Sequence, residues 1–167
     1  RQITLKNRVV ITGEGSISPL GLDSKSLWNH IINGKSGIRK IESFNTENFS
    51  VKIAGEITDF NPEDYFLPKE IKKLDRFTML SLFASDQAVS SSGYDKKDVG
   101  VIVGTGVGGM HTLEEEQKKF LNKGQRGVSP FYVPKMIPNI AGGQIAIKNG
   151  FSGANFSMST ACSSATD

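Results

Sequence analysis

Apolar residues form several short runs that are typical of β-strands. The runs at 9–11 and 101–103 are continuous, and each leads into glycines. The first predicts a buried strand and the second a hydrophobic strand, each ending in a glycine turn. The segments 51–57 and 154–159 alternate apolar with polar residues. Such alternation predicts a short strand at 51–57, in a surface loop region, and a strand with one polar face at 154–159.

Other apolar residues recur at helical spacing. Residues 22–34 predict a helix whose N-terminus is capped by Asp23 or Ser24. The longest candidate helix covers residues 66–93 and ends at Gly93.

Two further helices are expected in the second half of the chain. Thr112 and Glu115 have the spacing of a capping box, which predicts a helix from there through Leu121. A last helix covers 137–150, and the pair Gly142–Gly143 inside it destabilises the helix unless another backbone packs closely there.

Strands that alternate with helices argue for an α/β fold. No internal repeat or linker divides the 167 residues, a length that suits one domain with a sizeable core. Residues 129–139 contain three prolines and are expected to form an irregular loop with exposed aromatic side chains.

The composition narrows the class of protein. Hydrophobic residues make up 37% and charged residues 22% of the chain, which is typical of a soluble globular protein. The net charge of +3 includes no basic stripe interleaved with aromatic residues, so nucleic-acid binding is not expected. The sequence has no apolar run of the roughly 20 residues that span a membrane, and it begins without the apolar stretch of a signal peptide. A single cysteine cannot form an intramolecular disulfide, and we therefore expect a cytoplasmic protein.

Glycines after the run at 101–103 match the pattern GxGxxG, at Gly104, Gly106 and Gly109. In dinucleotide-binding proteins, an acidic residue at the end of a second strand follows about 20 positions later. Here that region reads as helix and turn. The pattern therefore favours a turn that another backbone approaches closely, or one that lines a ligand channel with Val107 facing inward, over a nucleotide site.

The two histidines do not favour a metal site, because no cluster of cysteines or carboxylates accompanies them. We expect His30 at a surface or boundary position and His111 near a pocket, and we assign neither a catalytic role. No metal or cofactor is expected.

Cys162, the single cysteine, lies where the strand at 154–159 ends and a helix of small residues could begin. The N-terminus of a helix has a partial positive charge and free amide donors, which favour the nucleophilic thiolate and could stabilise an oxyanion. The small residues around Cys162 leave room for a substrate carbonyl. A buried structural cysteine is the alternative, and the local sequence alone does not decide between the two.

Four segments, in order, resemble motifs of the β-ketoacyl-acyl carrier protein synthases: RVVITGEGSISPLG, VGVIVGTGVGGM, SPFYVPKMIPN and STACSS. The resemblance covers nearly the whole chain. It implies a thiolase-like αβαβα fold made of two similar halves, in which the glycine turn is structural. This sequence is expected to be the N-terminal half, truncated after the nucleophile. The absent half would supply two histidines, a lysine and a phenylalanine gate.

The resemblance also implies functions for individual residues. Cys162 would be the nucleophile that receives an acyl group from acyl carrier protein (ACP) before condensation with malonyl-ACP in fatty-acid biosynthesis. One oxyanion donor would be the Cys162 backbone amide. Val107 would line the acyl tunnel, and Phe131 would reach into the acyl pocket of the partner in a homodimer. The strand at 154–159 would pair with its counterpart across the dimer axis.

The same resemblance gives a meaning to a basic cluster. Lys69, Lys72 and Lys73 match docking positions for the acidic ACP, and Arg126 would belong to the same patch. A solvated helix face is the alternative, since charge runs on helices are usually only that.

Two other functions stay open. The TACSS form of the cysteine motif also occurs in polyketide-type ketosynthases, and a catalytically incomplete half-synthase could act as an interaction module that dimerises or binds ACP. Half of a two-part core would expose a large apolar face, which soluble monomers rarely tolerate. We therefore expect residues 1–167 alone to be inactive in condensation, and poorly soluble or associated.

Overall fold

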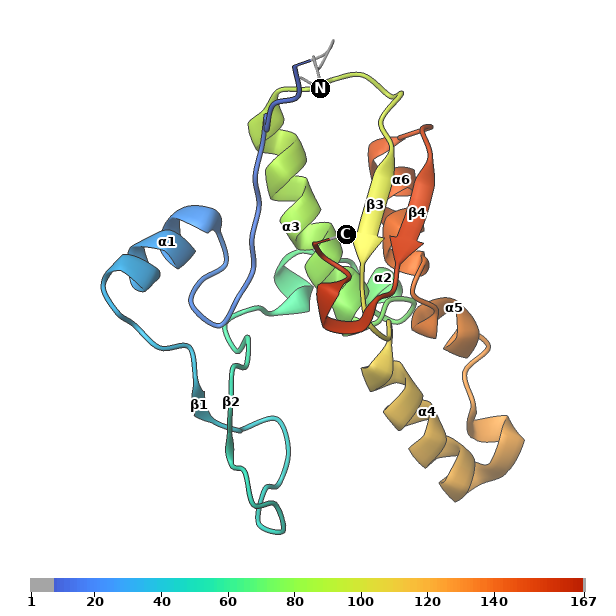
Figure 1. The fold of residues 1–167 in the computed structure, drawn as a ribbon. Helices are drawn as coiled ribbons and strands as arrows, with labels where there is room; N and C mark the ends of the chain where they lie inside the picture. The colour runs from blue at the N-terminus through green and yellow to red at the C-terminus, as the bar shows by residue number, and fades with distance from the viewer. Residues whose placement is uncertain (1–7, 167) are drawn as a thin grey trace, which may run out of the picture.

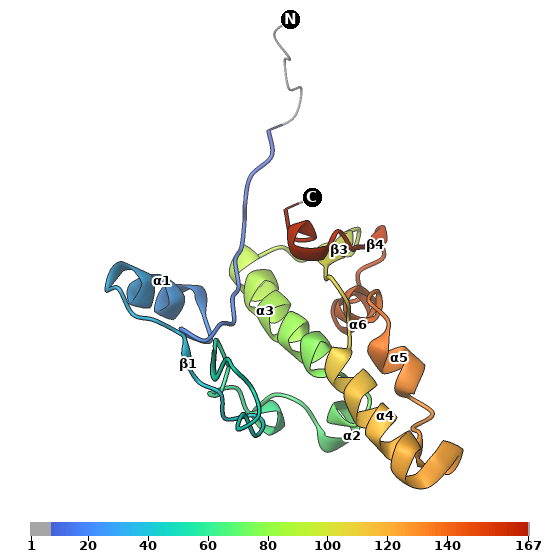
Figure 2. The same ribbon diagram turned by 60° about the horizontal axis from the view of Figure 1, so that its bottom comes forward.

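The structure is a computed structural model that describes residues 8–166. It is a mixed α/β arrangement, shown in Figures 1 and 2. The elements in chain order are α1 (Ser24–Ile32), β1 (Arg39–Lys40), β2 (Ile53–Ala54), η1 (Pro62–Asp64), α2 (Pro68–Ile71), α3 (Arg76–Ser92), β3 (Val101–Gly104), α4 (Met110–Lys123), η2 (Gly124–Gly127), α5 (Tyr132–Met136), α6 (Ile140–Asn149), β4 (Asn155–Met158) and η3 (Ala161–Ser163).

A parallel pair of strands, β3 and β4, forms the centre of the fold. Their register runs from Val101 opposite Asn155 to Gly104 opposite Met158. Helices α3 and α6 pack against each other, and α6 also contacts both strands (Figures 1 and 2). The buried apolar residues lie on these elements and on the segment that leads into α3, namely Phe60, Phe66, Leu74, Met79, Leu82, Val101, Ala141 and Ile145.

The other face of the strand pair is apolar and exposed. Ile102 and Phe156 are register partners, and 69% and 58% of their respective surfaces are exposed. The polar positions of β4 face inward instead: the side chain of Asn155 lies against Gly142 of α6, and the Ser157 hydroxyl is buried. The expected polar face of this strand therefore exists, and it packs on α6.

The predicted strand at 9–11 is wrong. Val9 and Ile11 are each 92% exposed, and no strand among the described residues pairs with this segment. The chain instead follows α3 (Figure 1). Gly13 and Gly15 lie so close to the α3 backbone that neither position could hold a Cβ. The segment thus uses its glycines to approach a helix, whereas a strand would need a neighbouring strand to satisfy its backbone.

The first predicted helix and the short strand are confirmed. Asp23 caps α1, because its Oδ1 accepts a hydrogen bond of 2.8 Å from the Ser26 amide. This bond and a second one from the Ser26 hydroxyl lower the pKa of the Asp23 carboxyl. In the region of 51–57, β2 pairs with β1 in an antiparallel hairpin that projects from the body of the molecule (Figure 1).

The longest predicted helix is interrupted. It divides into α2 and α3, with Lys72–Asp75 between them. The interruption follows from Asp75, whose Oδ1 accepts a hydrogen bond of 3.0 Å from the Phe77 amide and so caps a new helix. Gly93 ends α3 in the left-handed conformation, as expected.

The predicted capping box is also wrong. Helix α4 begins at Met110 with Gly109 as its cap, so Thr112 lies inside the first turn and is buried.

The irregular loop at 129–139 contains the short helix α5. Helix α6 is confirmed, but its two glycines differ. A Cβ at Gly142 would lie 2.5 Å from Asn155 Oδ1 and would displace that side chain, whereas at Gly143 no heavy atom of residues 8–166 outside the local helix backbone lies within 4 Å of such a Cβ. Among residues 8–166, no helix has both the length and the apolar character needed to cross a membrane.

Candidate active site

The parallel pairing of β3 and β4 brings the candidate nucleophile next to the glycine turn. Both strands end at the same edge of the sheet, where the turn at 104–109 follows β3 and the turn at 160–164 follows β4. The Thr105 amide donates to the Met158 carbonyl at 3.0 Å, which extends the pairing to this edge. Two motifs that lie more than 50 positions apart in the sequence therefore form one site.

The two turns are in direct contact. The Ser159 hydroxyl donates to the Gly106 carbonyl at 3.2 Å. A Cβ at Gly106 would lie 3.7 Å from the Cα of Ala161, an ordinary contact, whereas a Cβ at Gly104 would collide with the Ser164 carbonyl. The prediction of a structural glycine turn that another backbone approaches closely is confirmed.

Cys162 lies in a strained turn and is exposed. The residue before it, Ala161, has a φ of +55° and is the one non-glycine residue with positive φ among residues 8–166. Such a conformation costs on the order of 1–3 kcal/mol and persists only where its surroundings enforce it. Here the buried Ser164 hydroxyl does so, because it accepts from the Thr160 amide at 2.9 Å and donates to the Ala161 carbonyl at 2.7 Å.

The element at Cys162 differs from the α-helix that we expected. Ala161–Ser163 form a 3₁₀ helix, held by bonds such as that from the Ser164 amide to the Ala161 carbonyl. The positive φ of Ala161 makes the entry into this turn sharp. Cys162 is exposed within residues 8–166, so this part of the chain gives no support to the alternative of a buried structural cysteine.

Val107 and Phe131 both lie on the segments that surround this edge. Val107 is 56% exposed at the tip of the glycine turn, and Phe131 is 41% exposed at the start of α5. The turn is fixed to the end of α5, because the Gly109 amide donates to the Met136 carbonyl at 2.8 Å. Gly108, with a φ of +82°, has no room for a Cβ beside the same carbonyl.

The basic residues lie in two separate regions of the fold. Lys69 lies on α2, Lys72 and Lys73 follow it directly, and all three are exposed. The Lys73 ammonium lies 5.5 Å from the centre of the Phe131 ring, so the cluster reaches the α5 segment. Arg126 is exposed on η2, after the C-terminus of α4, and the 14 residues of that helix separate it by about 20 Å from the α4 N-terminus.

The residue that sequence reasoning missed is Glu116. It is only 2% exposed, its Oε1 lies 2.7 Å from Lys119 Nζ, and its Oε2 accepts from the Ser129 amide at 2.6 Å. Burial raises the pKa of Glu116, but the bonds from Lys119 and Ser129 outweigh it, so the pKa lies below its ordinary value. The signal in the sequence was a lysine three positions after the acid, a common pattern on solvated helices.

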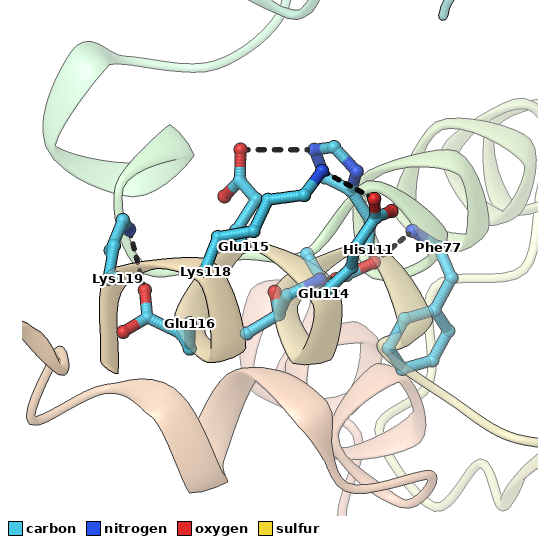
Figure 3. A network of polar contacts seen from close by, with 9 residues as sticks. Phe77, His111, Glu114, Glu115, Glu116, Lys118 and Lys119 are labelled. Carbon is cyan, nitrogen blue, oxygen red and sulfur yellow. Dashed lines mark hydrogen bonds and ion pairs between the residues drawn. The ribbon is translucent and has the colours of Figure 1, made fainter. Parts of the chain in front are cut away.

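Figure 3 shows Glu116 beside the other polar side-chain pairs of α4. His111 pairs with Glu115 at 3.4 Å and Glu114 with Lys118 at 2.5 Å, both on exposed positions of the helix. Glu115 thus interacts with a side chain one turn earlier and does not cap the helix. Unlike these exposed pairs, Glu116 connects α4 to the chain that leads to Phe131.

The histidines lie where we expected them. His30 is partly buried, with Nδ1 against the Leu20 carbonyl, and His111 lines a pocket together with Glu56 and Arg76. No group of three or more potential metal ligands comes together in the described part of the chain.

These features define a class of protein. The exposed Cys162 lies in a strained turn after the parallel strand β4, beside the glycine turn that follows the neighbouring strand β3. Residues 6–167 match the family described as "Beta-ketoacyl synthase, N-terminal domain". The chain belongs to this family.

Several curated relatives share one name. A 3-oxoacyl-[acyl-carrier-protein] synthase 2 of Staphylococcus aureus (strain N315) is 44% identical over 165 residues, which are 96% of this chain and 40% of the relative. The protein of the same name from Vibrio cholerae is 40% identical over 162 residues, covering 94% and 39% of the two chains. The chain therefore spans about 40% of the length of the curated relatives it matches.

Solved structures show the same fold. The ishigamide ketosynthase/chain length factor matches with a TM-score of 0.81 and 24% identity, over 90% of this chain and 39% of that one. A type II polyketide synthase ketosynthase, solved in complex with its acyl-carrier protein, matches with a TM-score of 0.75 and 24% identity, over 93% of this chain and 42% of that one. At this identity the likeness establishes the thiolase-like fold and no more.

Proposed function

We propose that the protein is a 3-oxoacyl-ACP synthase of fatty-acid biosynthesis, and that Cys162 is its nucleophile. The observation that carries the proposal is that Cys162 is exposed in a turn where Ala161 has a positive φ. This turn lies next to the glycine turn that contains Val107. The relatives at 40–44% identity have this activity in their names. Because the chain spans about 40% of their length, the proposal concerns the complete enzyme.

The reaction we propose has two stages. In the first, Cys162 Sγ attacks the thioester carbonyl of acyl-ACP, the acyl group moves to the cysteine, and the carrier thiol leaves. In the second, malonyl-ACP loses carbon dioxide, and the resulting carbanion attacks the carbonyl of the acyl-enzyme. The Cys162 thiolate leaves, and the product is a 3-oxoacyl-ACP two carbons longer.

The remaining chemistry is divided between this chain and the C-terminal half of the enzyme. The Cys162 amide is one donor to the oxyanion, and Val107 lines the tunnel that receives the acyl chain. The two histidines that assist decarboxylation belong to the half of the family fold that follows these residues. No metal or cofactor enters the reaction that we propose.

ACP is the partner that suits the basic cluster. Lys69, Lys72 and Lys73 present three exposed positive charges within five positions, which favours an acidic protein. Arg126 would contact the same carrier from a second position. One of the similar structures is a ketosynthase in complex with its acyl-carrier protein, which supports this choice of partner.

A homodimer is the assembly that we infer, with Phe131 directed towards the partner's acyl pocket and β4 at the dimer axis. The exposed apolar surface around Ile102 and Phe156 supports further association of this half, since such surfaces are rarely left to solvent. We expect the enzyme in the cytoplasm, where its carrier-bound substrates are made.

Mass spectrometry of the complete enzyme tests the function. Incubation with acyl-ACP should add one acyl group to the peptide that contains Cys162, and subsequent malonyl-ACP should remove it as 3-oxoacyl-ACP. Cys162→Ser should lose both steps. Acylation at another residue, or none in a folded enzyme, would contradict the proposal.

A polyketide-type ketosynthase is the second candidate, supported by the similar solved structures. The identity of 40–44% to the fatty-acid enzymes, against 24% to these structures, favours fatty-acid synthesis. Repeated condensation without reduction of the 3-oxo group would indicate the polyketide function. An interaction module would bind ACP without acylation of Cys162.

A further inference from the structure

The carboxylate of Asp75 connects two elements that the proposed reaction uses separately. Asp75 is only 3% exposed. Its Oδ1 accepts from the Phe77 amide at 3.0 Å and so caps α3, while its Oδ2 accepts from the Thr112 amide at 2.8 Å. Thr112 is in the first turn of α4, 37 positions further along the chain. One side chain thus holds the N-termini of two helices together.

This carboxylate also lies close to the end of the glycine turn. A Cβ at Gly109 would lie 3.1 Å from Asp75 Oδ2 and 2.6 Å from the Lys135 carbonyl. Gly109 is confined on both sides, because its amide also donates to the Met136 carbonyl at 2.8 Å. Val107 is two residues before Gly109, so the position of Asp75 helps to fix the position of Val107.

On its other side, Asp75 follows the docking cluster directly. Lys72 and Lys73 are the third and second residues before Asp75. Leu74, which lies between Lys73 and Asp75, is buried in the core. The segment that we expect to bind ACP and the turn that we expect to meet the acyl chain are therefore joined through one carboxylate. Hydrogen bonds to a charged acceptor are stronger than neutral ones, and a carboxylate at helix N-termini is additionally favoured by the helix dipoles.

We propose that Asp75 is a positioning residue that fixes Val107 relative to the ACP-docking segment and thereby sets the acyl-chain preference of the enzyme. The inference rests on the proposed function. Asp75 acts through the Thr112 amide and the glycine turn, and it does not touch the reacting atoms.

The test compares Asp75→Ala and Asp75→Asn in the complete enzyme. The measurement is kcat/KM for a short and a long acyl-ACP, from which the ratio between the two chain lengths follows. We expect Asp75→Ala to move this ratio towards one by about tenfold, because a loosened turn discriminates less between chain lengths. Asp75→Asn retains one acceptor oxygen and should give a smaller change in the same direction. If Asp75→Ala does not fold, the kcat/KM ratio of Asp75→Asn alone tests the inference.

Asp86→Asn is the matched control, since Asp86 is also on α3, is half-exposed and pairs with Lys148. Its ratio should equal that of the unsubstituted enzyme. A uniform loss of kcat/KM for both chain lengths in the Asp75 variants, or an unchanged ratio, would overturn the inference and leave the chemistry of Cys162 intact. If the unsubstituted enzyme forms no 3-oxoacyl-ACP, the proposed function and this inference fail together.

Discussion

The ammonium group of Lys73 lies 5.5 Å from the centre of the Phe131 ring. A cation over an aromatic face is favourable by about 0.5–1 kcal/mol at an exposed site. The contact joins the end of the basic cluster to Phe131, the N-cap residue of α5. Two regions that the sequence presents as unrelated, a charged stretch and a proline-rich loop, thus form one continuous surface.

This surface leads to a prediction about carrier binding. Replacing Lys69 and Lys73 together with Glu should raise KM for acyl-ACP by about tenfold, because attraction to an acidic partner becomes repulsion. The measurement is steady-state kinetics in the complete enzyme at two salt concentrations. The rate of Cys162 alkylation by iodoacetamide should stay unchanged.

Lys25→Glu provides the control for this charge reversal, since Lys25 is an exposed lysine on α1 and belongs to no docking position. Its KM should equal that of the unsubstituted enzyme. If the double variant and the control behave alike, the basic cluster is only a solvated helix face.

A second prediction concerns Glu116 and pH. Its pKa is lowered in the folded protein, so the stability it contributes is present above its ordinary pKa of 4.5 and is lost as the pH falls through the lower, folded value. We expect Glu116→Gln to reduce the protection of the Ser129 amide against hydrogen exchange near neutral pH. The difference from the unsubstituted protein should shrink below pH 4.5.

Glu114→Gln is the matched control for that measurement. Glu114 is on the same helix and pairs with Lys118, which lowers its pKa as well, but its side chain is 62% exposed and its ion pair stays within α4. The protection of Ser129 should not change in this variant. Equal losses in the two variants would mean that the helix as a whole, and not the Glu116 bond, protects the amide.

Local patterns predicted much of the fold because they reflect local physics. The helix that Asp23 caps and the α6 helix both depend on neighbours within a few positions, so spacing was sufficient. The strand at 9–11 failed for the opposite reason. Its apolar run carries no information about whether another strand lies beside it, and here it follows α3.

The site illustrates the same division. The sequence identified Cys162 and the glycine turn, but nothing local indicates that Ser164 fixes Ala161 at positive φ or that Ser159 contacts Gly106. The sequence pattern also did not indicate the role of Asp75. This residue interrupts a predicted continuous helix, and its bond to Thr112 joins residues 37 positions apart.

A third prediction uses the tip of the glycine turn. Val107→Phe should lower kcat/KM for a long acyl-ACP by about tenfold or more while it spares a short one, because the larger ring fills space that the end of a long chain would occupy. The measurement is product length from a mixture of acyl-ACPs. Val133→Phe, at a position of similar exposure on α5, should leave the distribution unchanged. A uniform effect on all chain lengths would place Val107 outside the tunnel.

The contact between the two turns gives the last prediction. A Cβ at Gly104 would collide with the Ser164 carbonyl, and that carbonyl belongs to the turn that holds Cys162. Gly104→Ala should therefore destabilise the protein by about 1–3 kcal/mol and displace the cysteine, lowering both the rate of alkylation of Cys162 and condensation. Gly143→Ala is the matched control, because within residues 8–166 no heavy atom beyond the backbone of its own helix and its chain neighbours lies within 4 Å of the new Cβ. Removing a glycine from a helix should stabilise the protein by about 0.5–1 kcal/mol and leave Cys162 unaffected. Thermal unfolding together with the alkylation rate distinguishes the two variants, and equal effects would mean that the close packing of Gly104 does not position the nucleophile.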